Sequence, residues 1–386
     1  MIYQKSKIYL ILFLTASALN CKAQVEQPIF KEAVGSPFQV GRKPADVTLA
    51  DVNNDANLDI ITANAESRDI TILLGDGRGS FKPPAGSPFS AHSAVHLIAA
   101  GDNNGDGNAD IVSTEHDSYD ITIMFGDGTG NFSFNPELKL KALNGSKPHN
   151  HGLALIDMNK DSKLDIITAN HEDNNITVLL GEGNAKFSPA PGSPFMVKRG
   201  PYPFTVNDFN NDGNLDIAAP NLLGKSVTIL SGNGRGEFSE SALSPISVEE
   251  RPYYVTTGDL NGDKWNDIVV VHDDITKAVI LLNDGKGGFK YSSSSPYELG
   301  FTSFKIIIED INSDSKKDLI LTNTSSDKIN ILLGDGLGGF TKAPGSPYQT
   351  GDSPNYITIG DLNKDGKPDI ISTNFNSNNV TVLLGR

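Results

Sequence analysis

The chain has 386 residues, of which 38% are apolar and a further 38 are glycine, a composition that suits a folded protein and excludes a disordered one. Its formal net charge of −15 argues against a nucleic-acid partner. The single cysteine excludes a disulfide framework and any metal site built from several thiolates.

The chain begins with the pattern of a secretion signal. Two lysines precede a short apolar run, Ile8 to Leu14, and small residues follow it. We expect residues 1–23 to be a signal peptide and residues 24–386 to form one domain with no transmembrane segment. An alternative stays open, in which the signal ends at residue 20 and Cys21 carries a lipid anchor. Either case predicts a protein that is secreted or held at the cell surface, as an outer-membrane lipoprotein if Cys21 is lipidated.

One acidic pattern recurs along the whole chain. The nonapeptide Asp-x-Asn-x-Asp-x-x-x-Asp occurs seven times, with successive spacings of 51, 55, 51, 51, 51 and 51 residues. Its copies begin at Asp51, Asp102, Asp157, Asp208, Asp259, Asp310 and Asp361. Such regularity indicates an array of one repeated structural unit.

Each repeat predicts four short strands. In the first repeat, β-rich segments lie before the acidic pattern, directly after it (Leu58 to Asn64), at Ile70 to Leu74, and from Phe81 to Phe89. Glycine, asparagine and aspartate turns separate these segments, and none of them has helical periodicity. Four-stranded units at this period are typical of β-propeller blades. We therefore predict an all-β, seven-bladed propeller of four-stranded antiparallel blades.

The two ends of the chain predict how the ring closes. The segment that starts at Phe30 is a near copy of the fourth-strand segment that starts at Phe340. The chain stops at Arg386, directly after the third strand of the last repeat. We expect the N-terminal strand to complete blade seven, which removes the free sheet edges that an open array would expose.

The acidic pattern predicts a binding loop for a hard cation. Side-chain oxygens at positions 1, 3, 5 and 9 suit calcium, which prefers several oxygen ligands. The alternative is that Asp and Asn merely favour turns, but turns alone do not require acids at fixed offsets. Seven calcium ions would add +14 to the formal charge of −15. Glycine occupies position 6 in only three copies, so we expect affinities to differ, with the loop at Lys264 weakest.

The segment from Asp361 to Ile370 resembles the FG-GAP/VCBS repeat, the unit of the integrin α-subunit propeller and of many secreted bacterial proteins. The resemblance covers nearly all of the expected mature chain. It implies a seven-bladed propeller with up to seven Ca²⁺ ions, each in the hairpin that joins the first two strands of a blade. The ligands it implies are Asp51, Asn53, Asp55, Asp59, Asp102, Asn104, Asp106, Asp110, Asp157, Asn159, Asp161, Asp165, Asp208, Asn210, Asp212, Asp216, Asp259, Asn261, Asp263, Asp267, Asp310, Asn312, Asp314, Asp318, Asp361, Asn363, Asp365 and Asp369.

The opposite face of the propeller is the predicted ligand site. The residues six before each acidic pattern should begin the innermost strands, near the central funnel; they are Ala45, His96, His151, Tyr202, Tyr253, Phe304 and Asn355. Five of them carry aromatic or imidazole rings. On the same face, the turns between second and third strands add His116, His171 and His272, and the links between blades add His92, His149, Arg199 and Arg251. The predicted ligand-binding residues are His96, His149, His151, Tyr202, Tyr253, Phe304, Arg199 and Arg251. The alternative is that the aromatic rings only pack between blades.

Two functions are consistent with these residues. The first is a non-catalytic, monomeric module that binds a glycan or protein ligand at the cell surface. The second is a polysaccharide lyase, in which His or Tyr removes a proton beside a uronate and Arg neutralises the acid. The resemblance implies no single activity, since the family contains adhesins, lectins, envelope proteins and some lyases. The pair His149-x-His151 could bind zinc but lacks an assigned third ligand.

Overall fold

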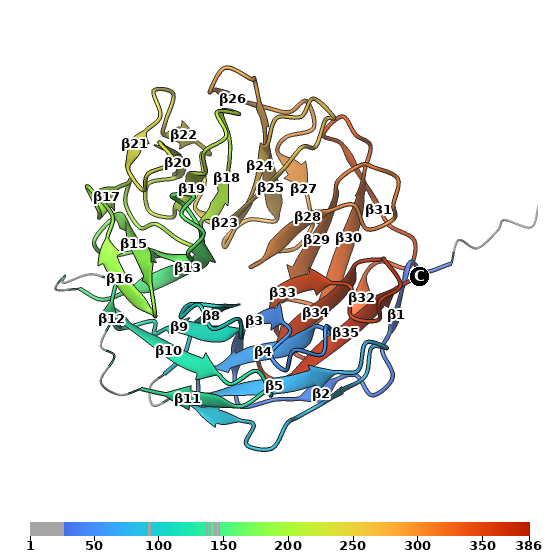
Figure 1. Ribbon diagram of the computed structural model, residues 1–386. Helices are drawn as coiled ribbons and strands as arrows, with labels where there is room; N and C mark the ends of the chain where they lie inside the picture. Colours follow the sequence, from blue (N-terminus) through green and yellow to red (C-terminus); the bar gives the residue numbers. More distant parts are fainter. Residues whose placement is uncertain (1–26, 92–93, 136–137, 139, 143–144, 146) are drawn as a thin grey trace, which may run out of the picture.

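The computed structural model describes residues 27–91, 94–135, 138, 140–142, 145 and 147–386. In this part of the chain every regular element is a β-strand, and the strands form seven antiparallel sheets that stand in a ring (Figure 1). The predicted seven-bladed propeller is confirmed. The predicted signal peptide, Cys21 and His92 lie outside the described residues. Within the described part, no helix is long and apolar enough to cross a bilayer.

Each blade has three inner strands and an outer strand made of two short pieces. The innermost strands are β3 (Pro44–Ala50), β8 (Leu97–Gly101), β13 (Asn150–Ile156), β18 (Thr205–Asn207), β23 (Pro252–Gly258), β28 (Ile306–Glu309) and β33 (Pro354–Gly360). The second strands are β4 (Asp59–Asn64), β9 (Asp110–Thr114), β14 (Asp165–Asn170), β19 (Asp216–Asn221), β24 (Asp267–His272), β29 (Asp318–Asn323) and β34 (Asp369–Asn374). The third strands are β5 (Asp69–Gly75), β10 (Asp120–Gly126), β15 (Asn175–Gly183), β20 (Ser226–Gly232), β25 (Lys277–Asn283), β30 (Lys328–Gly334) and β35 (Asn379–Gly385). The outer pieces are β6 (Phe81–Lys82) and β7 (Phe89–Ser90), β11 (Phe132–Phe134) and β12 (Leu140–Lys141), β16 (Lys186–Pro189) and β17 (Phe195–Met196), β21 (Phe238–Glu240) and β22 (Ile246–Ser247), β26 (Phe289–Tyr291) and β27 (Tyr297–Glu298), β31 (Phe340–Lys342) and β32 (Tyr348–Gln349), and β1 (Phe30–Glu32) and β2 (Phe38–Gln39).

The second strand of every blade is buried along its whole length. Neighbouring blades cover both of its faces, which explains why it is rich in Ile and Val rather than alternating between apolar and polar residues. Ile61 and Ile72 of blade one, for example, pack in one cluster with Ile98 and Ile111 of blade two. The hydrophobic core is therefore a set of seams between blades.

The outer strand differs from the prediction of one continuous segment. In blade one it forms β6 and β7, which pair with opposite ends of β5. The turn between them contains Pro83 and Pro84, which have no amide hydrogen to donate to a sheet, and Gly86, which has a φ of 99°. The hydroxyl of Ser87 in this turn accepts the amide of Ile72 and holds the turn against the third strand.

The N-terminal segment completes blade seven, as predicted. Strands β1 and β2 both pair antiparallel with β35, in the register Phe30 to Gly385 and Phe38 to Val380. The C-terminal end of the chain lies beside β1 in Figure 1, and the amide of Arg386 bonds to the carbonyl of Ile29. Both ends of the chain thus share one sheet, and the ring has no open seam.

Removing the Phe30 side chain should weaken this closure. Phe30 is 2% exposed and packs in a cluster formed by blades six and seven, with its ring edge-on to Tyr348. We expect Phe30→Ala to lower the free energy of unfolding by about 3 kcal/mol, measured by urea denaturation. The control is Val34→Ala, at a side chain that is 86% exposed, which should change it by less than about 0.5 kcal/mol. Equal stability of the two variants would show that the N-terminal segment does not close the ring in solution.

Candidate functional site

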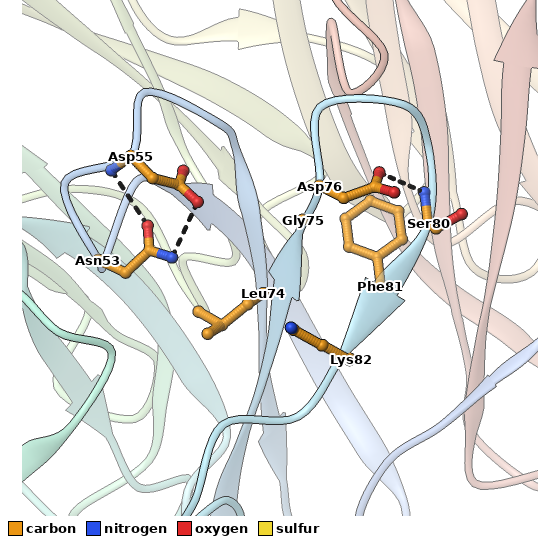
Figure 2. Close-up of a pocket in the computed structure, with 8 residues that line it drawn as sticks. All are labelled: Asn53, Asp55, Leu74, Gly75, Asp76, Ser80, Phe81 and Lys82. Atoms are coloured by element: carbon orange, nitrogen blue, oxygen red, sulfur yellow. Dashed lines mark hydrogen bonds between the residues drawn. The ribbon is translucent and has the colours of Figure 1, made fainter.

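The acidic loops and the glycine turns lie at the same end of each blade. Figure 2 shows this for blade one, where Asn53 and Asp55 of the acidic loop face the turn that holds Asp76 and Ser80. Together they line a surface pocket of about 440 Å³ whose floor includes Leu74. The glycine turns are hairpins between two strands, as predicted, and open no helix.

All seven acidic loops have one hydrogen-bonding pattern. The carboxylate at position 1 accepts hydrogen bonds from the backbone amides of positions 5 and 6. In the first loop, Asp51 accepts hydrogen bonds from the amides of Asp55 at 3.1 Å and Ala56 at 2.7 Å. The same two bonds recur in the other loops. Position 6 has a positive φ in every copy, including 70° at Lys264, so the loop keeps its shape where glycine is absent. The predicted differences in calcium affinity remain a prediction.

The aspartate at position 9 has a second role that the sequence did not reveal. Asp59 is fully buried, and its carboxylate accepts the amides of Val52 in the acidic loop and of Gly75 at the end of the third strand. The equivalent aspartates make the same pair of bonds in all the other blades, at 2.8–3.1 Å. Burial raises the pKa of Asp59 to about 6, against the effect of these two bonds. This carboxylate therefore joins the loop to the sheet. It makes these bonds without a metal ion.

The inner strands begin around a cavity on the ring axis. Its volume is about 290 Å³, and its lining includes every one of the seven residues predicted to begin the innermost strands: Ala45, His96, His151, Tyr202, Tyr253, Phe304 and Asn355. Pro203, Tyr356 and Phe375 also line it and were not predicted, and His116, which was expected on this face, completes the lining. Position in the repeat, counted back from the acidic pattern, was thus enough to gather seven distant residues at one place.

The rings of this lining contact one another in series. His151 stacks on Tyr202 with centroids 4.0 Å apart, Tyr202 contacts Tyr253 at 4.9 Å, and Tyr253 stacks on Phe304 at 5.0 Å. All but His151 are half-buried, so each ring both packs against its neighbour and faces the cavity. The two interpretations made from the sequence, packing between blades and lining a ligand site, are therefore compatible.

The two predicted arginines do not line the cavity. The guanidinium of Arg251 lies 3.3 Å from the carboxylate of Asp273, and Arg199 is exposed on the link before blade four. His149 also lies outside the lining, although it contacts two histidines that belong to it.

Five histidines from blades two and three gather at one side of the cavity, and we call His96, His116, His149, His151 and His171 the histidine cluster. The amide of Asn150 bonds to the carbonyl of His116 across the two blades, and the amide of His171 bonds to the carbonyl of His149. His116 and His171 follow the second strands of their blades, so they approach the cavity from turns rather than from the innermost strands. His272 is the last residue of the second strand of blade five, the place that Asn170 has in blade three, and among the described residues it makes no ring contact with the cluster.

Burial keeps much of the histidine cluster neutral. It lowers the pKa of His151 to about 2 and that of His96 to about 4, and neighbouring imidazoles act in the same direction. The pKa values of His149 and His171 are also lowered, again mainly by burial. These four rings therefore offer nitrogen lone pairs rather than positive charge at neutral pH.

A smaller cavity of about 50 Å³ adjoins the first one and shares His151 with it. It contains Asp46 and Lys305, whose ammonium lies 4.5 Å from the ring of Tyr254 and 4.8 Å from that of Tyr356. Burial raises the pKa of Asp46 to about 6, although the charge of Lys305 and two backbone amides oppose the shift.

The FG-GAP-like repeat matches this sequence at residues 51–113, 102–168, 157–219, 259–321 and 310–372. These matches span more than half of the chain. The chain belongs to the FG-GAP-like repeat family. A comparison with curated proteins finds no match.

Solved structures with this fold have low sequence identity to this FG-GAP-like protein. BBS1N, solved in complex with ARL6DN, has a TM-score of 0.65 at 10% identity, over 94% of this chain and 98% of that one. An Agrocybe aegerita lectin that recognises non-reducing terminal N-acetylglucosamine has a TM-score of 0.59 at 18% identity, over 88% and 86% of the two chains. A virginiamycin B lyase from Staphylococcus aureus has a TM-score of 0.55 at 14% identity, over 92% and 97%. These similarities establish the fold alone.

The raised pKa of Asp46 predicts a pH dependence of stability. The folded protein holds this proton up to about pH 6, whereas the unfolded chain loses it near pH 4. The native state binds more protons in that interval, so the contribution of Asp46 to the unfolding free energy falls as pH rises from about 4 to about 6. We expect the unfolding free energy of the wild-type protein, relative to Asp46→Asn, to fall by about 3 kcal/mol over this interval. Urea denaturation at each pH measures this, and a constant difference would contradict the buried, protonated Asp46.

Proposed function

We propose that this protein is a non-catalytic binding module, exported to the cell surface or beyond, that recognises a glycan at its central cavity. The observation that carries this proposal is the series of rings from His151 to Phe304 around a cavity of about 290 Å³. A space of that size lies at the lower end of ligand sites and suits one sugar ring. The export proposal rests on the signal pattern of the first residues.

The chemistry of the lining suits a sugar better than a charged ligand. Aromatic rings pack against the apolar C–H groups of a pyranose, while the Asn355 amide and the tyrosine hydroxyls can bond to its hydroxyls. The lectin from Agrocybe aegerita shows that this fold can carry glycan recognition. BBS1N, solved with ARL6DN, has the same fold in complex with a protein, and a protein ligand is the other partner that the propeller could bind.

We also propose that the acidic loops bind calcium. Each loop gathers two carboxylates and one amide oxygen, at positions 1, 3 and 5, within one tight turn, as Asp51, Asn53 and Asp55 do in blade one. These are hard oxygen donors of the kind that calcium prefers, so the residues present fit the ion. A bound ion would neutralise carboxylates that otherwise repel one another. The position-9 carboxylate keeps the loop in place for it.

Lyase activity is the second candidate, favoured by the stacking of His151 on Tyr202 at the cavity. A neutral imidazole beside a phenol could act as a proton-transfer pair. A uronate substrate, however, needs a cation for its carboxylate, and neither Arg199 nor Arg251 lines the cavity. The binding module is therefore the better supported function.

The glycan proposal predicts binding without turnover. The purified protein, in a calcium-containing buffer, should retain specific sugars on a glycan array. Tyr253→Ala should weaken that binding about tenfold, because it removes the central ring of the series. Tyr291→Ala is the matched control, since Tyr291 lies on the outer strand and is 41% exposed. Equal melting temperatures of the two tyrosine variants would show that Tyr253→Ala weakens glycan binding through the cavity and not through loss of stability.

Two results would contradict this function. One is the absence of any glycan preference that depends on Tyr253. The other is a rising ultraviolet absorbance of unsaturated uronate on incubation with acidic polysaccharides, abolished by His151→Ala, which would establish the lyase instead.

A further inference from the structure

In the histidine cluster, one nitrogen of His149 lies close to nitrogens of two other histidines. The Nε2 of His149 lies 3.0 Å from the Nε2 of His116 and 2.9 Å from the Nε2 of His151. The three residues come from the turn after β9, from the link before β13, and from β13 itself. His116 supplies the third nitrogen that the sequence pair His149-x-His151 lacked.

The outer nitrogens of two of these rings face carboxylates. The Nδ1 of His116 lies 2.7 Å from Asp117, and the Nδ1 of His149 lies 3.7 Å from Glu172. A carboxylate holds the ring proton on the nitrogen that faces it, which leaves the lone pair of the neutral ring on Nε2. The Nε2 lone pairs of His116 and His149 then point into the same space. Two lone pairs at that distance repel one another unless a cation or a proton lies between them.

We propose that His116, His149 and His151 bind one divalent transition-metal ion, with zinc as the best match. Three neutral imidazoles are the ligand set of open zinc sites, whereas calcium requires oxygen ligands. Zinc–nitrogen bonds of about 2.0–2.1 Å in a tetrahedron place the nitrogens roughly 3.4 Å apart, so the distances from the Nε2 of His149 to those of His116 and His151 need to widen by only a few tenths of an ångström. The site takes its fourth ligand, a water or a ligand oxygen, from the cavity that His116 and His151 line.

The surroundings of these histidines differ from those of histidines that only fill a core. The side chains of His116 and His149 are 38% and 26% exposed, so an ion can reach them. Asp117 and Glu172 offset the charge of a divalent ion and orient its ligands, as carboxylates do at histidine metal sites. Beside them, His171 is 6% exposed, and its Nδ1 has no hydrogen-bond partner among the residues that the structure describes.

This site is separate from the acidic loops and does not depend on glycan binding. The acidic loops follow the C-terminal ends of the innermost strands, whereas these histidines lie near the strand beginnings. A protein that binds no glycan could still hold the ion, and loss of the ion would leave the calcium loops intact.

Zinc titration of the purified protein, followed by calorimetry, tests this site. Millimolar calcium is present so that it competes with zinc for the oxygen-rich loops. We expect one zinc equivalent. His116→Ala and His151→Ala should each weaken it by at least about 100-fold, and Asp117→Asn by about tenfold. His272→Ala is the control, because His272 is a buried histidine at the end of the second strand of blade five, away from the three proposed ligands, and it should leave zinc affinity unchanged.

Cobalt titration of the unmodified protein adds a readout that needs no variant, since nitrogen-rich tetrahedral Co²⁺ has strong visible bands and oxygen-bound octahedral Co²⁺ does not. If the alanine variants fail to fold, the zinc anomalous signal in crystals of the unmodified protein shows where the ion binds. A peak among the three Nε2 atoms supports the site. Zinc found only at the acidic loops, zinc binding that survives His116→Ala, or no zinc binding at all would overturn it.

Discussion

The rest of the structure depends on one buried carboxylate in each blade. The aspartate at position 9 of the acidic pattern opens the second strand and accepts one amide from the loop before it and one from the end of the third strand. A buried carboxylate without these donors would be costly, so the two bonds fix three chain segments together. In blade one the third-strand partner is Gly75, where a Cβ would lie 2.3 Å from the carbonyl oxygen of Leu58. This close approach of two backbones favours the glycine that stands here in six blades, whereas blade five has Asn283 and keeps the same bond.

This constraint also determines what happens at the other face. The acidic loops hold one end of each blade, and the innermost strands begin around one cavity at the opposite end. The residues six before the acidic pattern therefore meet in one cavity, although up to 310 residues separate Ala45 from Asn355 along the chain. Side chains that differ from blade to blade at this position give the cavity its chemistry, while the fold stays constant. Function in this propeller is expected at the irregular positions of a regular array.

Much of this could be predicted because the repeat is nearly invariant. The spacing of the acidic pattern predicted the blades, and the duplicate of the fourth strand at Phe30 predicted the closure of the ring. Counting from the pattern also predicted Tyr202, Tyr253 and Phe304 at the cavity. The backbone bonds of Asp59 could not be predicted, because a carboxylate in an acidic loop suggests an ion before it suggests an amide.

The histidine cluster shows the limit of counting within one repeat. His151 was predicted from its place at the start of an innermost strand and His149 from the link before it. His116 was expected on the same face, but it lies in a different blade and at a different place in its repeat, so its contact with His149 was not predicted. Only the three-dimensional contact between blades two and three brings its Nε2 to that of His149. The link before β13 is also the irregular one, with the longer spacing of 55 residues, so its course could not be taken from the other blades.

Positions 1 and 9 of the acidic pattern have different roles: the position-9 carboxylate holds the loop to the sheet even without an ion, whereas the position-1 carboxylate is a ligand of the calcium ion that we propose. Blade four offers the direct comparison of Asp216→Asn with Asp208→Asn, because Asp216 is fully buried and bonded to Phe209 and Gly232 while Asp208 lies in the exposed loop. The measurement is the free energy of unfolding of both variants, in chelator and in calcium. We predict that Asp216→Asn costs about 2–3 kcal/mol in both conditions, and that Asp208→Asn costs stability mainly in calcium. Equal effects of the two substitutions in chelator would contradict the account.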